Sequence, residues 1–92
     1  MKTLHTLNGC HQDTVTLCLQ GLADHDTLLL IQDGVLLPKV QLQAIDASAV
    51  VYLEVDCAAR SQKTISGARQ VTYDGFVELC EQHDRVINWN CP

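Results

Sequence analysis

The chain has 92 residues, of which 47% are hydrophobic and 18% charged, and its formal net charge is −5. This length predicts one small domain, residues 1–92. The six Lys and Arg residues are scattered, which argues against direct nucleic-acid binding, and no apolar run approaches the roughly 18 residues of a membrane span. The five cysteines are odd in number and follow no recognisable export signal, which favours free thiols in a reducing cytoplasm.

The first half of the chain predicts two strands and two helices. Residues 2–7 alternate polar and apolar before the Asn8-Gly9 turn signal, which indicates a strand. Apolar residues at helical spacing follow Asp13, a plausible N-cap, and predict a helix. The continuous apolar run 28–31 ends at Gln32-Asp33-Gly34 and is typical of a strand buried on both faces. Residues 35–46 then predict a short helix.

The second half repeats the alternation. Residues 50–55 are rich in β-branched side chains and predict a strand, after which Asp56 is expected to cap a helix. A weaker strand over 68–72, a helix over about 74–83 and a short last strand over 86–89 complete the pattern. Strands alternating with helices predict a three-layer α/β/α fold with a mostly parallel sheet of four to five strands.

Reactive groups in such sheets gather beyond the carboxyl ends of the strands. Residues 8–11, residues 32–34 and the Asp56-Cys57 pair occupy those positions. The chain has neither GxGxxG nor GxxxxGK[ST], so no nucleotide cofactor is expected.

Three cysteines are candidate reactive thiols. Cys57 lies at an expected helix start, where backbone N–H groups favour a thiolate, although it could simply fill a turn. Cys10 stands beside His11, which could accept its proton, but adjacent side chains rarely converge. Cys18 shares the apolar face of the first predicted helix, where burial would raise the pKa of its thiol and silence it.

The other candidates are weaker. Cys80 and His83 match half of a zinc site, but no second pair has suitable spacing, so no metal is expected and core packing is favoured for Cys80. Cys91 is expected in a mobile tail without a partner. His5 and His25 are interpreted as strand and loop residues with no catalytic role.

Four stretches of the chain resemble the TusB/DsrH family of small sulfur-relay subunits. They are MKTLHTLN at the start, LLLIQDGV at 28–35, VYLEVDCAAR at 51–60 and VTYDGFVELCEQHDRVINW at 71–89. Together they cover nearly the whole chain in order. The chain departs from the family's Ala-Arg-Gly, which is Ala59-Arg60-Ser61 here, and the sequence between the second and third strands is short.

The resemblance implies a cytoplasmic subunit with a DsrE-like fold that assembles with TusC/DsrF-like and TusD/DsrE-like subunits into a persulfide-carrying hetero-oligomer. Such a complex supports 2-thiolation of the tRNA wobble uridine in the Tus branch and sulfur oxidation in the Dsr branch. The main sulfur acceptor belongs to another subunit, which makes this chain an accessory part of a sulfurtransferase. By its spacing to Gln32-Asp33-Gly34, Cys18 matches the first-helix cysteine of DsrH-type members and is the candidate persulfide carrier.

Two other functions stay open from the sequence. The chain could be a stand-alone, homo-oligomeric binding domain whose cysteines only pack, or a small thiol enzyme that uses Cys57 or Cys10. Persulfide relay needs an accessible thiolate and neither a metal nor a nucleotide, which suits this chain.

Overall fold

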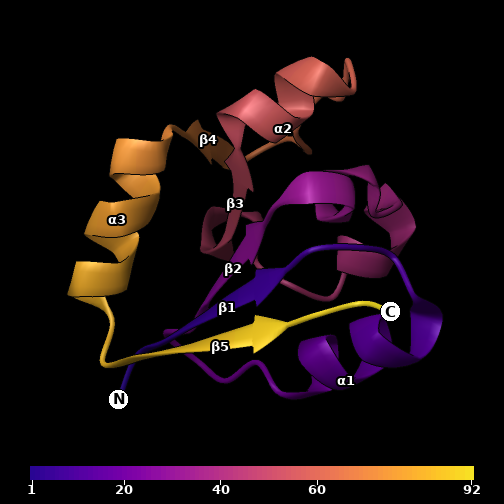
Figure 1. The fold of residues 1–92 in the computed structure, drawn as a ribbon. Coiled ribbons are helices and arrows are strands. Elements are labelled where there is room, and N and C mark those ends of the chain that lie inside the picture. The colour runs from indigo at the N-terminus through magenta and orange to yellow at the C-terminus, as the bar shows by residue number, and fades with distance from the viewer.

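The computed structural model describes residues 1–92 and contains one five-stranded, all-parallel sheet in the order β4-β3-β2-β1-β5 (Figure 1). The strands are β1 (Thr3–Leu7), β2 (Thr27–Leu30), β3 (Val50–Leu53), β4 (Arg69–Val71) and β5 (Arg85–Trp89). The last strand returns to pair with β1, in register from Thr3 opposite Arg85 to Leu7 opposite Trp89. The N- and C-terminal segments are therefore hydrogen-bonded neighbours.

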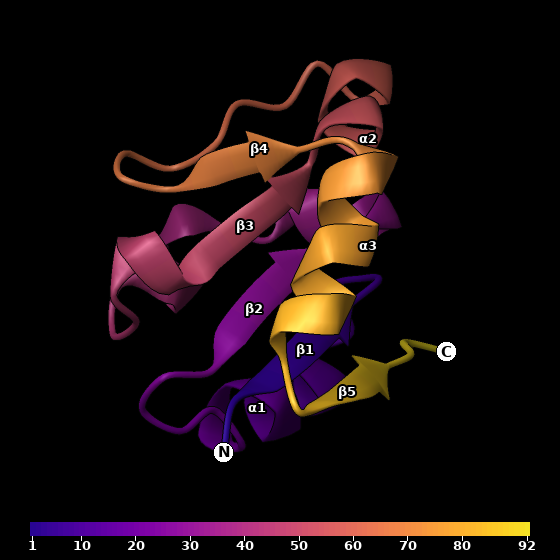
Figure 2. The same cartoon turned by 90° about the vertical axis from the view of Figure 1, so that its left-hand side faces the viewer.

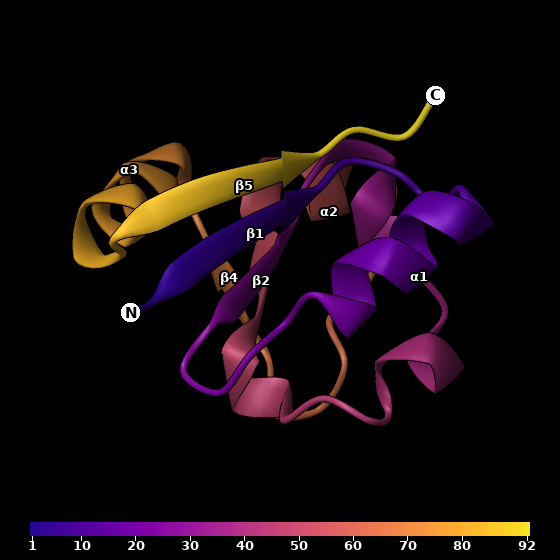
Figure 3. The same ribbon diagram turned by 90° about the horizontal axis from the view of Figure 1, so that it is seen from below.

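Helices cover both faces of the sheet, as Figures 2 and 3 show. Helix α1 (Gln12–Gln20) lies on one face together with the segment that joins β2 to β3, and α3 (Tyr73–Gln82) lies on the other. Strands β1 to β4 follow one another across the sheet in chain order, and because parallel crossovers are right-handed, their connections all lie on one face. The return from β4 to β5 places α3 opposite them. The predicted α/β/α fold is confirmed.

The larger hydrophobic cluster lies on the α1 face and contains eleven buried residues. Cys57 of α2 (Glu54–Ala59) also belongs to this cluster. The smaller cluster consists of Leu4, Leu29, Val51 and Leu79 beneath α3. Cys18 and Cys57 therefore lie in the main core, whereas Cys80 packs against the smaller cluster.

Two predicted helices differ from the observed ones. Residues 35–46 form no single helix but parts of two 3-10 turns, Gln32–Leu36 and Lys39–Leu42. Pro38 between them lacks an N–H and disfavours helical backbone at the preceding residue. Helix α2 begins at Glu54 with Leu53 as its N-cap, so the predicted capping role of Asp56 is wrong.

No helix in the chain combines the length and the apolar character needed to cross a membrane.

Ser61 follows α2 in left-handed backbone, with a φ of 50°. Side chains with a Cβ adopt that conformation at a cost, whereas glycine adopts it freely. We expect Ser61→Gly to raise the free energy of unfolding by about 0.5–1 kcal/mol, measured by urea denaturation. Ser66→Gly is the matched control, because Ser66 is also exposed and has no positive φ; an equal gain there would refute the backbone explanation.

Candidate functional site at the carboxyl edge of the sheet

The turn after β2 lies directly against the end of β1. The Ile31 N–H donates to the Leu7 carbonyl over 3.0 Å. A Cβ placed on Gly34 would lie 2.1 Å from the same carbonyl oxygen, so no larger residue fits without moving one of the backbones. Gly34 thus sets the close approach of the β1 and β2 ends on which the site is built.

Polar contacts join this turn to the start of α2. The Gln32 N–H donates to Asp56 Oδ2 over 2.6 Å, and Arg60 Nε donates to Asp33 Oδ1 over 2.8 Å. Arg60 Nη1 also lies 3.5 Å from Asp56 Oδ1. The LLLIQDGV and VYLEVDCAAR stretches are therefore in direct contact. Because Asp56 accepts a hydrogen bond from the neighbouring turn, its carboxylate connects helix α2 to the turn after β2, where the sequence predicted a helix cap.

The segment that contains these contacts is similar to known proteins. A family model described as DsrH like protein matches residues 9–86. The chain belongs to the DsrH-like family. It is also 33% identical over 95 residues to Protein TusB of Pectobacterium carotovorum subsp. carotovorum (strain PC1), an alignment that covers 94% of this chain and 99% of that protein. The family resemblance that the sequence motifs indicated is confirmed.

Cys18 is fully buried in this DsrH-like chain, with 0% of its surface exposed. It lies on the inner face of α1 beside Val15, as the helical spacing predicted. Burial, and to a lesser extent the nearby Cys91, raises the pKa of the Cys18 thiol to about 12. In the isolated chain Cys18 is thus shielded from donors and protonated at neutral pH.

We expect Cys18 to react last with a soluble alkylating reagent. A pKa of about 12 in place of the ordinary 9.0 leaves roughly a thousandfold less thiolate at neutral pH, and burial slows access further. Time-resolved peptide mapping of the alkylated chain should show Cys10 modified early and Cys18 late. Fast labelling at neutral pH that disappears in Cys18→Ser but persists in Cys57→Ser would contradict the buried state.

Cys57 is 2% exposed and lies inside α2 rather than at its first residue. Burial and then the Asp56 carboxylate raise the pKa of its thiol, and Arg60 opposes them only in part. The expectation that the helix start would favour a Cys57 thiolate is therefore wrong, because Cys57 is the fourth residue of α2 and its thiol is buried.

Cys10 is exposed at the β1–α1 loop, and its Sγ–H donates to the Asp33 carbonyl over 3.2 Å. The neighbouring His11 pairs instead with Thr14, with Nδ1 at 3.3 Å from Oγ1. No hydrogen bond joins Cys10 to His11, so the structure does not form the Cys–His pair that the sequence suggested. Cys10 nevertheless remains the most accessible of the three candidate thiols.

Cys91 is anchored, contrary to the expectation of a mobile tail. Its N–H donates to Asn8 Oδ1 over 2.7 Å, and Asn8 Nδ2 donates to Asn90 Oδ1 over 3.3 Å. The Cys91 side chain is half-buried and packs against the main core. Asn8 therefore ties the C-terminal segment to the end of β1.

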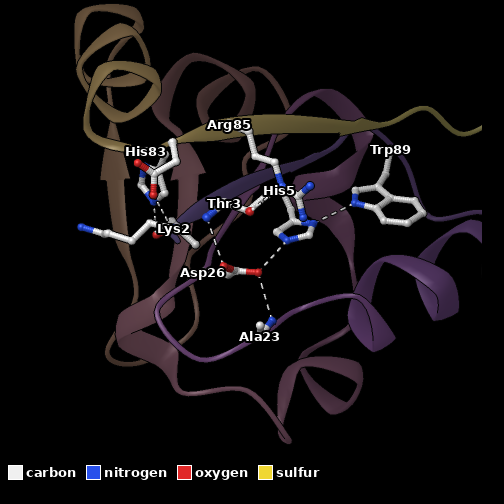
Figure 4. A network of polar contacts seen from close by, with 10 residues as sticks. Lys2, Thr3, His5, Ala23, Asp26, His83, Arg85 and Trp89 are labelled. Atoms are coloured by element: carbon white, nitrogen blue, oxygen red, sulfur yellow. Dashed lines mark hydrogen bonds and ion pairs between the residues drawn. The ribbon is translucent and has the colours of Figure 1, made fainter.

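The sequence reasoning missed a buried polar network around His5 (Figure 4). His5 is 1% exposed, its Nε2 lies 3.0 Å from Asp26 Oδ2, and Trp89 Nε1 donates to its Nδ1 over 3.0 Å. An indole N–H can only donate, so Nδ1 accepts and Nε2 carries the proton directed at Asp26. His5 thereby links β1 to β5 and to the loop before β2.

His83 has protein partners for both ring nitrogens. Nδ1 lies 2.6 Å from the Leu79 carbonyl oxygen, and Nε2 lies 2.9 Å from Thr27 Oγ1. Cys80 packs against the cluster beneath α3, as predicted from its helix face. These contacts give both residues structural roles at the end of α3.

Proposed function

We propose that this chain is a subunit of a cytoplasmic sulfur-relay complex that supports 2-thiolation of the tRNA wobble uridine. The observation that carries the proposal is the family match over residues 9–86 together with 33% identity to a protein named TusB across nearly the full length of both chains. The contact between Gln32-Asp33 and Asp56-Arg60 supports it, since two of the stretches that carry the resemblance form one structural unit.

The partners we propose are a TusC/DsrF-like and a TusD/DsrE-like subunit, with sulfur carried as a persulfide. Several large apolar side chains of the isolated chain are exposed, among them Val55 of α2 and Tyr73 and Val77 of α3. Exposed apolar groups of this kind are suited to subunit contacts. In this arrangement tRNA is handled by a later enzyme, which agrees with the net charge of −5.

The decisive experiment is to delete the gene and quantify 2-thiouridine in bulk tRNA by nucleoside mass spectrometry. We expect the modification to fall strongly and to return when the wild-type gene is supplied. Unchanged 2-thiouridine would refute the Tus assignment. As a separate test of assembly, the chain should copurify with the two homologous subunits when the three are co-expressed; a homodimer that excludes them would refute the proposed complex.

Cys18 supports a second candidate, a DsrH-like subunit in sulfur oxidation, because its place on α1 matches the cysteine of DsrH-type members. Because Cys18 is buried, it can carry a persulfide only if its thiol becomes exposed. Helix α1 would have to shift in the assembled complex to expose Cys18 and lower the pKa of its thiol. If Cys18→Ser restores 2-thiouridine in the deletion strain as fully as wild type, Cys18 is dispensable for the Tus function.

A further inference from the structure

A hollow of about 600 Å³ lies at the carboxyl edge of the sheet and has cysteines on two different segments of its wall. Cys10 comes from the β1–α1 loop and Cys91 from the segment after β5. Asp33, Leu36 and Pro92 also line it. Residues from opposite ends of the chain thus share one solvent-accessible space.

The backbone brings Cys91 within reach of Cys10. A Cβ placed on Gly9 would lie 2.8 Å from the Cys91 Cβ and 3.1 Å from its Sγ, so the Cys91 side chain lies directly over Gly9. Cys10 is the next residue, one Cα–Cα step of about 3.8 Å away. A disulfide needs a Cα separation of about 4.4–6.8 Å, so closing one here requires the β1–α1 loop and the C-terminal segment, which line the same hollow, to bring the two cysteines to that separation.

Little holds the Cys10 side chain away from Cys91. Its single hydrogen bond is the 3.2 Å contact to the Asp33 carbonyl, and a thiol is a weak donor. Cys91, by contrast, is held in place by Asn8 through its backbone N–H. The exposed Cys10 thiol can therefore rotate, whereas the backbone of half-buried Cys91 is held in place.

The two thiols also interact electrostatically. Burial raises the pKa of Cys10, and the charges of Cys91 and Asp33 raise it further. The raised pKa leaves less Cys10 thiolate at neutral pH, and that thiolate fraction is the nucleophile of the site. Closing a disulfide removes both potential charges from this space.

We propose that Cys10 and Cys91 form a dithiol site that accepts sulfane sulfur from a persulfide and closes into an intramolecular disulfide. The Cys10 thiolate attacks the outer sulfur of R–S–SH, the donor S–S bond breaks, and R–S⁻ leaves and is protonated. Cys10 then carries –S–SH. The Cys91 thiolate attacks the inner sulfur, Cys10 Sγ, and HS⁻ leaves with the electron pair of the broken bond. The two thiols are oxidised to a disulfide and the sulfane sulfur is reduced to sulfide, so no other oxidant is needed.

This site goes beyond the proposed relay function and does not involve Cys18. It would discharge sulfane sulfur that reaches the edge of the subunit, and it would link the start of α1 covalently to the C-terminal segment. The resulting closed loop spans nearly the whole chain, and such long loops gain most from a cross-link in the chain-entropy account.

The test uses the reduced full-length chain, treated with glutathione persulfide without oxygen. Peptide mapping after alkylation identifies the modified cysteines, and a colorimetric assay measures the sulfide released. We expect a Cys10–Cys91 cross-linked peptide and about one sulfide per chain, as the stoichiometry of exchange requires. Cys91→Ser should retain the persulfide on Cys10 and release sulfide at least about tenfold more slowly. Cys10→Ser should give neither the cross-link nor the sulfide.

Cys80→Ser is the matched control, because Cys80 lies on the opposite face of the sheet, and it should behave as wild type. Cys91→Ala provides a second variant should the serine disturb packing, with circular dichroism as the check on folding. A cross-link between Cys91 and Cys18, or undiminished sulfide release from both Cys91 variants, would overturn the proposal. Neither outcome bears on the gene-deletion test, which measures tRNA thiolation in the cell.

Discussion

Gly34→Ala is expected to destabilise the fold by at least about 3 kcal/mol, a large share of the roughly 5–15 kcal/mol that holds a small domain folded. The added Cβ would lie 2.1 Å from the Leu7 carbonyl oxygen and 3.0 Å from the Leu7 carbonyl carbon. Both are backbone atoms at the carboxyl end of β1, so no side-chain rotation can relieve the clash. Urea denaturation followed by circular dichroism measures the loss of unfolding free energy. If the loss exceeds the stability of the wild-type chain, the variant will be unfolded even without urea.

Gly21→Ala is the matched control for this prediction. Its Cβ would meet the Leu17 carbonyl oxygen at 3.3 Å and Trp89 Cζ2 at 3.4 Å, and its φ is −81°. These contacts are tight but can relax, so we expect a change within about 1 kcal/mol. Equal losses in the two variants would mean that a general cost of replacing glycine, rather than the approach of β1 to β2, explains the effect of Gly34.

Local patterns in the sequence were sufficient to predict the fold class. The unbroken apolar run 28–31 indicated a strand buried on both faces, and most of it forms β2, the central strand of a five-stranded parallel sheet with helices on either side. The spacing of Val15 and Cys18 correctly predicted the buried face of α1. These features depend on residues a few positions apart, which is the range over which hydrophobic periodicity is informative.

The features that the sequence could not predict depend on contacts between distant residues. Asp56 resembles a helix cap locally, but its carboxylate accepts the Gln32 N–H from another loop. Cys91 resembles a free tail residue, yet Asn8 holds it against Gly9 through contacts that span nearly the whole chain. Likewise, nothing near His5 in the sequence indicates that Asp26 and Trp89 supply its two ring partners. The return of β5 to pair with β1 brings Cys91 to Asn8 and Trp89 to His5.

The Asp26 carboxylate is the centre of the buried network. It accepts the Thr3 N–H at 3.0 Å and the Ala23 N–H at 3.0 Å in addition to the proton on His5 Nε2. Burial alone would raise the pKa of Asp26, but the hydrogen bonds from Ala23, His5 and Thr3 together outweigh it and hold the pKa below its ordinary value of 3.8. The ionised form of Asp26 is therefore more stable in the folded chain than in the unfolded one.

We expect Asp26→Ala to lower the free energy of unfolding by about 3 kcal/mol at pH 7, because it leaves the buried donors of Thr3 and His5 and the partly buried Ala23 N–H without an acceptor. Asp24→Ala, in the same loop but exposed, should cost less than about 0.5 kcal/mol.

The loss in Asp26→Ala should depend on pH with a definite sign. A lowered carboxyl pKa contributes stability that is fully present above the unfolded value, here about 3.8, and is lost as the pH falls through the folded value. The difference between wild type and Asp26→Ala should therefore be constant from pH 7 to about pH 5 and shrink below about pH 4. Urea denaturation series at these pH values measure it. A difference that stays the same at the lowest pH would contradict this prediction. Protonated Asp26 would then stabilise the contact between β1 and the loop before β2 as well as the carboxylate does.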